Sequence, residues 1–264
     1  MRTAAVAGAE RIARAFAEHG RRAALMPYLM GGFPDADASR ASAEACVEGG
    51  ADLLELGVPF SDPLADGPVI QAAGAEALRA GTRLDDVLEL CEALAARVPV
   101  VLMAYANPVL VHGAEAFAVR ASAAGAAGII VPDLPHDEAG ELRDVCDAHG
   151  LALVPLAAPT TTEERLAEIA ADARGFVYAV SVTGITGERD ALPEGLGDTV
   201  ARIRGATDLP VAVGFGIATG EQARRAAGVA DGVIVGSRLV RAAGEGGPAA
   251  VREVVAELAA ALRA

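Results

Sequence analysis

The chain alternates short apolar, β-branched runs with Ala/Glu/Arg-rich segments of helical length, and this alternation limits the folds open to it. We expect strands at residues 25–31, 53–58, 98–105, 127–131, 152–156, 176–181, 211–214 and 232–235. We expect helices between them at residues 38–49, 70–80, 84–97, 114–124, 137–149, 162–172, 199–204 and 220–227. Strict alternation of strand and helix indicates parallel strands joined by right-handed crossovers.

Eight such units in 264 residues have the size and count of a (β/α)8 TIM barrel. The competing fold, a doubly wound open sheet, has fewer strands and a glycine-rich fingerprint after the first one. Here the first strand ends Met30-Gly31-Gly32-Phe33-Pro34, which is not GxGxxG. We therefore expect residues 1–264 to form a single TIM-barrel domain with an extra N-terminal helix. That helix, within residues 4–22, is Ala/Arg-rich like a transit peptide, but Glu10 and Glu18 favour an ordinary amphipathic helix.

The charge balance restricts the partners of the chain. With 22 basic against 36 acidic residues the formal net charge is −14, which argues against binding to nucleic acid or to an anionic membrane surface. No apolar run approaches the ~18 residues of a membrane span. Three isolated cysteines are expected to be buried thiols in a reducing compartment: Cys46, Cys91 and Cys146. We expect a soluble, cytoplasmic protein.

Glu55 is a carboxylate inside an apolar strand. In the run 53–58, Leu54, Leu56 and Val58 share one face, and Glu55 shares the other with Leu53 and Gly57. Leucine on both faces indicates a strand that is buried on both sides. A buried, unpaired carboxylate has a raised pKa, and a carboxyl group poised near neutral pH suits acid–base catalysis. We expect Glu55 to point into the barrel.

Glycines and hydroxyls follow the sixth, seventh and eighth strands. In barrel enzymes the site lies where strands end and loops begin, and phosphate is often bound after the last two strands. Glycines there expose backbone N–H groups, and Ser237 begins a short helix whose N-terminus favours an anion. The glycines alone would also be explained as tight turns. Together these strand ends predict a phosphate site, which must rely on close-range donors because the net charge repels anions.

The loop after the second strand carries two more carboxylates, Asp62 and Asp66. Loop aspartates commonly cap turns or helices, and we interpret Asp62 in that way. Asp66 is open to both interpretations, as a cap of helix 70–80 or as a partner of Glu55. The four histidines lack the grouping of a metal site, and none is expected to bind metal or to catalyse: His19, His112, His136 and His149.

Four motifs lie at the ends of predicted strands. The most specific is the uninterrupted run Glu55-Leu56-Gly57-Val58-Pro59-Phe60-Ser61-Asp62-Pro63-Leu64-Ala65-Asp66-Gly67-Pro68. The others are Tyr105-Ala106-Asn107-Pro108, Gly184-Ile185-Thr186-Gly187 and Gly214-Phe215-Gly216-Ile217. With these motifs the chain resembles, over nearly its whole length, the tryptophan synthase alpha chain family. The resemblance implies a TIM barrel that cleaves indole-3-glycerol phosphate into indole and D-glyceraldehyde 3-phosphate in tryptophan biosynthesis.

The resemblance also implies roles for individual residues. Glu55 is expected to be the principal acid–base group and Asp66 the second catalytic carboxylate. The substrate phosphate is expected near Thr186, Gly187, Gly216, Gly236 and Ser237. The indole pocket is expected to be lined by Tyr28, Met103, Tyr105, Tyr178 and Phe215, with Tyr178 also bordering the glycerol phosphate. Asp133, with Asp62, is expected to take part in communication between the strand-two loop and a partner subunit.

The chain departs from some relatives, which carry Phe in place of Tyr28 and Arg in place of Val182. The second difference bears on the strand-six loop, residues 186–196, which we interpret as a lid. By the resemblance, the chain acts in an α2β2 heterotetramer with a tryptophan synthase beta chain. No metal or organic cofactor is expected in this chain, and pyridoxal phosphate is expected only in the beta chain.

The chemistry suits the two carboxylates. Cleavage requires protonation of indole C3 and removal of a proton from the neighbouring hydroxyl, which a near-neutral Glu55 can perform, while an ionised Asp66 accepts the indole N–H. Three alternatives remain open at this point. They are a stand-alone indole-3-glycerol phosphate lyase that releases free indole, a non-catalytic activator of a beta chain, and another phosphate-binding barrel such as an isomerase.

Overall fold

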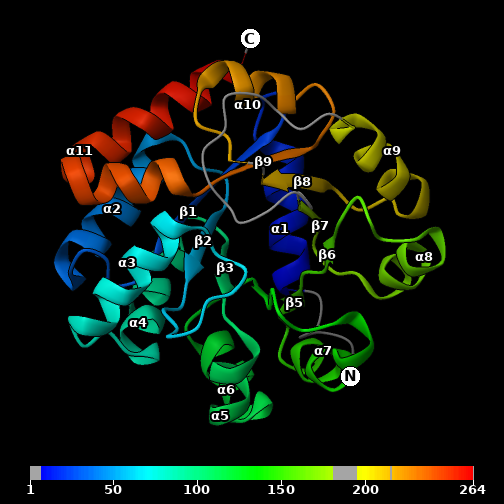
Figure 1. Cartoon of the computed structure of the whole chain (residues 1–264), viewed down its shortest axis with the longest axis horizontal. Coiled ribbons are helices and arrows are strands. Elements are labelled where there is room, and N and C mark those ends of the chain that lie inside the picture. The colour runs from blue at the N-terminus through cyan, green and yellow to red at the C-terminus, as the bar shows by residue number, and fades with distance from the viewer. Residues whose placement is uncertain (1–6, 181–194, 215, 264) are drawn as a thin grey trace.

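A computed structural model of the chain describes residues 7–180, 195–214 and 216–263. Within these ranges all strand pairs are parallel, and helices surround the strands (Figure 1). The strands are β1 (Ala24–Met30), β2 (Leu54–Gly57), β3 (Val100–Met103), β4 (Gly128–Ile130), β5 (Ala152–Leu153), β6 (Leu156–Ala157), β7 (Val177–Val180), β8 (Val211–Gly214) and β9 (Gly232–Val235).

The sheet closes on itself at the fifth predicted strand. Its order is β5-β4-β3-β2-β1-β9-β8-β7-β6, so its two ends are segments separated in the chain only by Val154 and Pro155. The Val154 N–H donates to Ile129 of β4 (2.9 Å), and Pro155 accepts from the N–H of Tyr178 in β7 (3.0 Å). Because proline has no N–H to donate, the ladder is interrupted there. The nine described strands are thus the eight predicted ones with the fifth divided, and the predicted TIM barrel is confirmed.

The helices follow the predicted alternation, with one addition and one difference in length. They are α1 (Ala7–Glu18), α2 (Ala36–Gly49), α3 (Pro68–Arg79), α4 (Leu84–Ala95), α5 (Ala106–His112), α6 (Ala114–Ala123), α7 (Gly140–Ala148), α8 (Glu163–Asp172), α9 (Leu196–Ala206), α10 (Gly220–Ala226) and α11 (Ser237–Ala261), with a 3₁₀ turn η1 (His136–Glu138). Helix α5 was not predicted. Helix α11 is far longer than the short helix expected at Ser237, although the positive φ of Gly247 interrupts it.

Two apolar layers flank the strands. Leu54 and Leu56 belong to the outer layer between strands and helices, whereas Leu53 and Val101 belong to the cluster inside the barrel. Helix α1 closes the inner cluster, because Ile12 and Phe16 pack into it. This is the extra N-terminal helix that the sequence predicts. Among the described residues, no helix combines the length and the apolar character needed to cross a bilayer.

Candidate active site

Glu55 lies inside the barrel, as predicted. On β2 its register partners are Tyr28 of β1 and Val101 of β3, and its side chain lines a cavity of about 60 Å³. Only 1% of Glu55 is exposed. The residues before and after it, Leu54 and Leu56, face the surrounding helices. The period-two pattern of the sequence therefore gives the correct face of the strand.

The Glu55 carboxyl has an oxygen without a partner. Within the described residues, Oε2 accepts no hydrogen bond. Burial, and secondarily the negative charge of Asp66, raise the Glu55 pKa to about 8. The carboxyl group is therefore protonated at neutral pH and can donate a proton into the cavity.

Asp66 lies in the loop that leads from β2 to α3, and it turns back into the same cavity. Its side chain does not cap α3, because the N-cap residue is Gly67. Burial raises the Asp66 pKa to about 6, while a hydrogen bond from the hydroxyl of Tyr105 acts in the opposite direction. Asp66 is thus mostly ionised at neutral pH while Glu55 is not. When one of two neighbouring carboxyls is protonated and the other ionised, the first can act as an acid and the second can stabilise positive charge.

Asp62 is exposed in the same loop, and its carboxylate accepts a hydrogen bond from the hydroxyl of Ser61. It does not line the cavity. Asp133 is also exposed, and it accepts a hydrogen bond from the backbone N–H of Ala106 (2.8 Å), the first residue of α5. This hydrogen bond connects the loop after β4, which carries Asp133, to the segment after Tyr105.

Another part of the cavity wall is formed by the ends of β8 and β9, which β1 separates from β2. Gly214, Gly216, Gly236 and Ser237 line the cavity there. Ser237 begins α11, whose first N–H groups have no partner within the helix and point to this end. A helix N-terminus beside a glycine with positive φ, Gly216, favours an anion. The predicted Thr186 and Gly187, as well as Val182 and most of the proposed lid, lie outside the described residues.

The remaining wall is apolar and aromatic. Of the residues predicted for the indole pocket, Tyr28, Met103 and Tyr178 line the cavity, whereas Phe215 lies outside the described residues. Ile70 and Ile234 also line it and were missed. Ile234 precedes Gly236 by two residues, so strand alternation identifies it, and Ile70 lies in the first turn of the helix that follows Asp66.

Tyr105 does not line the cavity and lies behind Asp66 instead. It is buried, its ring centroid is 5.3 Å from that of Phe60, and its hydroxyl accepts a hydrogen bond from the N–H of Ala65 (3.1 Å). Tyr105 therefore fixes the strand-two loop. Its predicted place in the indole pocket stays a prediction.

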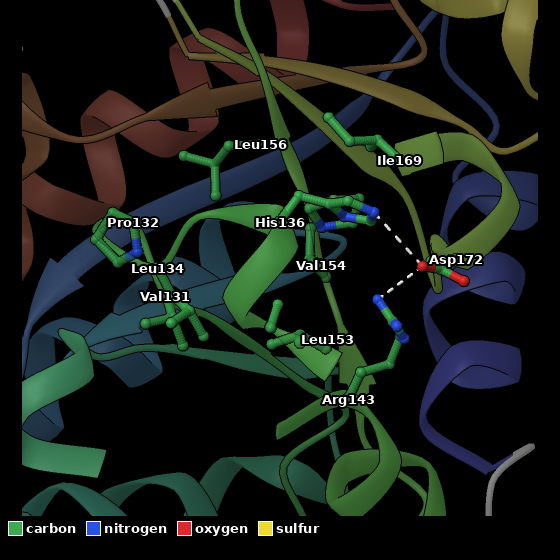
Figure 2. A pocket seen from close by; sticks show the side chains of 12 residues that line it. Val131, Pro132, Leu134, His136, Arg143, Leu153, Val154, Leu156, Ile169 and Asp172 are labelled. Atoms are coloured by element: carbon green, nitrogen blue, oxygen red, sulfur yellow. Dashed lines mark ion pairs between the residues drawn. The ribbon is translucent and has the colours of Figure 1, made fainter. Parts of the chain in front are cut away.

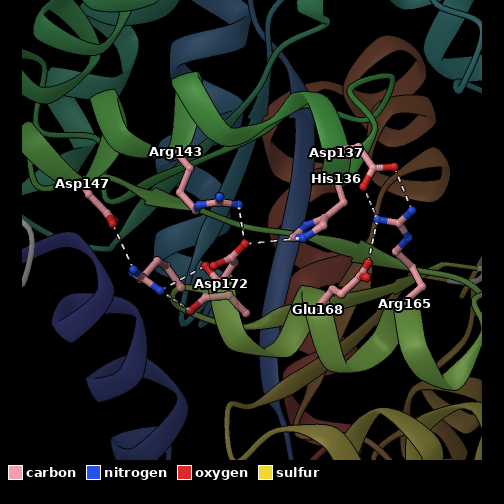
Figure 3. Close-up of polar contacts among 9 residues, drawn as sticks. His136, Asp137, Arg143, Asp147, Arg165, Glu168 and Asp172 are labelled. Atoms are coloured by element: carbon pink, nitrogen blue, oxygen red, sulfur yellow. Dashed lines mark hydrogen bonds and ion pairs between the residues drawn. The ribbon is translucent and has the colours of Figure 1, made fainter.

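A second cavity, of about 80 Å³, lies near η1, α7 and α8 (Figure 2). Its polar groups are paired with one another, because Asp172 contacts Arg143 (2.8 Å) and His136 (3.5 Å). Figure 3 shows this group beside a second one, in which Arg165 contacts Asp137 and Glu168. Among the described residues, none of the side chains that line this second cavity has an unpartnered buried polar atom. The central cavity, which has two such atoms, is the better candidate for chemistry.

Among the described residues no group of three or more His, Cys, Asp or Glu side chains has the geometry of a metal site. The four histidines lie apart from the central cavity. Two of them form ion pairs on the outside of the barrel, His136 with Asp172 and His149 with Glu115.

Comparison with known proteins gives one consistent result. The model of the family described as "Tryptophan synthase alpha chain" matches residues 15–263. The chain is 49% identical to the tryptophan synthase alpha chain of Geobacter sulfurreducens over 235 residues, 88% of this chain and 89% of that one. It is 50% identical to that of Synechococcus elongatus over 240 residues, 90% of each. Its fold is similar to a chain of Mycobacterium tuberculosis tryptophan synthase, with a TM-score of 0.91 and 44% identity, covering 96% of this chain and 98% of that chain.

Proposed function

The chain belongs to the tryptophan synthase alpha chain family, and on this premise we propose that Glu55 and Asp66 carry out its reaction. The reaction is the cleavage of indole-3-glycerol phosphate to indole and D-glyceraldehyde 3-phosphate, a step of tryptophan biosynthesis. The chain is accordingly a carbon–carbon lyase. Both carboxyl groups line the same buried cavity, so both can act on one bound substrate.

The bond that breaks joins indole C3 to a glycerol carbon that carries a hydroxyl. Protonation of C3 makes indole a leaving group. When the bond breaks, its electron pair returns to the ring, and the hydroxyl loses its proton as the aldehyde forms. The reaction therefore needs one group that first gives and then takes a proton, and one anion to balance the positive charge on the ring nitrogen.

Glu55 is the proton donor and acceptor in this scheme. Its raised pKa, about 8, keeps it protonated before the reaction. Its Oε2 has no hydrogen-bond partner among the described residues, and its side chain lines the cavity. After protonating C3 it is a carboxylate and can take the hydroxyl proton, which restores its starting state. Each proton transfer by a well-placed group contributes roughly 10²–10⁴-fold in rate.

Asp66 is the anion. Its pKa of about 6 leaves it ionised at the pH at which Glu55 is protonated. An ionised carboxylate can accept the indole N–H and stabilise the charge that develops there. The hydrogen bond from Tyr105 helps to keep Asp66 in this state.

The phosphate of the substrate is held at the ends of β8 and β9. Gly216 offers an N–H group after β8, and Gly236 and Ser237 offer N–H groups and a hydroxyl at the start of α11. By the family resemblance, Thr186 and Gly187 complete this site. The indole ring lies among Tyr28, Met103 and Tyr178, with Phe215 added by the same resemblance. Binding the phosphate, remote from the bond that breaks, positions the substrate.

The observation that carries the proposal is the pairing of a neutral, unpartnered Glu55 with an ionised Asp66 in one buried cavity. The test is to supply indole-3-glycerol phosphate to the purified chain and to follow the release of indole and glyceraldehyde 3-phosphate. Release by the wild type, and its loss in Glu55→Gln, supports the assignment. A wild-type chain that leaves the substrate intact contradicts the function.

We further propose that the chain works with a tryptophan synthase beta chain in an α2β2 complex in the cytoplasm. Solved relatives include tryptophan synthase of M. tuberculosis. Three large apolar side chains at the mouth of the barrel are exposed: Leu64 (89%), Leu110 (68%) and Val111 (76%). They lie on the strand-two loop and on α5, which Tyr105 connects, so a partner bound there would contact the loop that carries Asp66. The three cysteines are buried and unpaired, which supports a reducing compartment.

Titration of the purified chain with a beta chain tests this partnership. A large rise in the rate of cleavage, saturating at one beta chain per alpha chain, is the expected result. A chain that already turns over rapidly alone, and does not respond to the beta chain, is a stand-alone lyase. The pyridoxal phosphate of the beta chain takes no part in the cleavage proposed for this chain.

A further inference from the structure

The hydroxyl of Tyr28 is a second polar group without a partner in the central cavity. Tyr28 is 3% exposed, and among the described residues no protein group forms a hydrogen bond with its hydroxyl. A phenylalanine at this position would fill the same space with no buried hydroxyl to satisfy. A buried hydroxyl without a partner is destabilising, so its presence beside Glu55 needs a reason.

The backbone places this hydroxyl close to Glu55. Tyr28 and Glu55 are partners in the parallel register of β1 and β2, and both line the cavity. The tyrosine ring extends toward the mouth of the barrel over Gly57, where an added Cβ would lie 2.1 Å from the hydroxyl oxygen. Gly57 follows Glu55 by two residues on the same face of the strand. The hydroxyl therefore lies one layer nearer the mouth than the Glu55 backbone, in space that glycine leaves open.

The ring also lies beside the phosphate wall. An added Cβ on Gly236 would be 3.5 Å from Cδ1 of Tyr28, an ordinary packing distance. Tyr28 thus lies between the acid–base group and the residues proposed to hold the phosphate. The part of the substrate that must occupy this interval is the glycerol chain, which carries the hydroxyls.

Tyr28 can act in this place only as a hydrogen-bond donor or acceptor, and not as a base. Burial raises its pKa well above 10, and the charges of Asp66 and Glu55 raise it further. The phenolic proton is therefore retained at every pH at which the protein works. A fixed, neutral O–H group is suited to donate to an oxygen that is becoming a carbonyl.

We propose that the Tyr28 hydroxyl donates a hydrogen bond to the glycerol oxygen from which Glu55 removes a proton. The inference rests on the proposed roles in cleavage of indole-3-glycerol phosphate. During the step, the O–H proton of the substrate passes to Glu55. The carbon–carbon electron pair returns to the protonated indole ring, and the oxygen becomes the aldehyde carbonyl. Tyr28 keeps its proton throughout, so it orients the substrate O–H toward Glu55 and supports the new carbonyl.

Tyr28→Phe tests the proposal, because it removes the oxygen and keeps the ring. With one donor bond lost chiefly in the transition state, kcat is expected to fall about 5- to 10-fold, while KM changes less than about twofold. The melting temperature is expected not to fall, since the packing of the ring is kept. A Tyr28→Phe chain with wild-type kcat overturns the proposal.

A substrate analogue without the glycerol hydroxyls distinguishes two explanations for a lower kcat in Tyr28→Phe. One is the loss of a hydrogen bond to the substrate, and the other is a change in the shape of the pocket. Indole that carries a plain three-carbon chain ending in phosphate keeps the ring and the phosphate but offers no oxygen to Tyr28. Its Kd is expected to be equal for wild type and Tyr28→Phe. A Kd that weakens in the variant as much as kcat falls would mean that the hydroxyl acts by shaping the pocket, and the proposal would be wrong.

Ser42→Ala is the matched control. Ser42 lies on α2, is buried, and also has a hydroxyl without a partner among the described residues, but it does not line the cavity. Removal of the Ser42 hydroxyl is expected to leave kcat unchanged.

The outcomes of these experiments also distinguish this proposal from the function on which it rests. An inactive wild type contradicts the function, whereas an active wild type with an equally active Tyr28→Phe contradicts only the role of Tyr28.

Discussion

The hydroxyl of Tyr105 lies beside the carboxylate of Asp66 and lowers the pKa of that carboxyl group. The same hydroxyl accepts a bond from the N–H of Ala65, so the residue after β3 holds the loop after β2. Burial raises the pKa of both cavity carboxyls, but only Asp66 has this donor to oppose the rise. The two carboxyls therefore differ in pKa, which is about 6 for Asp66 and about 8 for Glu55. One contact between neighbouring strand ends thus helps to decide which carboxyl carries the proton.

The first prediction concerns the pH dependence of cleavage by the wild type. Below a pH of about 6 Asp66 gains a proton and cannot accept the indole N–H, and above about 8 Glu55 loses the proton that C3 requires. The plot of kcat/KM against pH should therefore be bell-shaped, with limbs near these values. A rate that keeps rising above a pH of about 9 would contradict the assignment of Glu55 as the initial acid.

The second prediction is that Tyr105→Phe moves the acidic limb of that profile to higher pH. Loss of the donor removes the influence that lowers the Asp66 pKa, while the basic limb, set by Glu55, moves little. The expected shift is roughly one pH unit, with about a threefold lower kcat/KM at a pH of about 6.5. Because the substrate phosphate also titrates near pH 6 but is identical in both experiments, an acidic limb that does not move would refute the role of Tyr105.

The third prediction is that Gly57→Ala strongly impairs the enzyme through Tyr28. The new Cβ would lie 2.1 Å from the tyrosine hydroxyl and 2.8 Å from Cζ, so the ring must move. We expect kcat/KM to fall at least 30-fold and Tyr28→Phe to restore part of the loss in the double variant. Gly205→Ala on α9, where an added Cβ meets nothing within 4 Å, is the control and should be neutral. Equal damage with and without the tyrosine hydroxyl would show that the clash is not with the Tyr28 hydroxyl.

The fourth prediction places the beta chain on the apolar surface at the mouth. Val111→Asp, on the exposed face of α5, should weaken activation by a beta chain at least tenfold and leave the basal rate of the alpha chain within about twofold. Val119→Asp on α6 is the control, since Val119 is also exposed but lies on the neighbouring helix. Titration of each variant with the beta chain gives both quantities. If both variants were activated as well as the wild type, the partner would have to bind elsewhere.

Local periodicity predicted most of the barrel. The strands at 211–214 and 232–235 begin and end where the sequence placed them, and the face of β2 that carries Glu55 follows from alternation alone. The break in the fifth strand was missed. The effect of Pro155 depends on whether a neighbouring strand would accept a hydrogen bond from an N–H at this position, and proline has none. Helix α5 was missed because Pro108 and the β-branched Val109 and Val111 do not resemble a helix in isolation.

The candidate site was less predictable than the fold. Strand ends identified Glu55, Asp66, Gly236 and Ser237 as neighbours, because every parallel strand ends at the same side of a barrel. The position of Tyr105 behind Asp66, and that of Tyr28 over Gly57, depend on contacts between different strands. Such contacts have no signature in a local pattern. The roles of Thr186, Gly187 and Phe215 stay predictions from the family resemblance.

The central claim is that Glu55 both gives and takes the proton, and Glu55→Gln measured with indole-3-glycerol phosphate tests it most directly. Glutamine keeps the size of the side chain and needs no charge in a buried site, so the fold should be retained, which a melting curve verifies. Because two proton transfers are lost, we expect kcat to fall at least about 10³-fold. A folded Glu55→Gln chain whose kcat stays within tenfold of the wild type would contradict the mechanism.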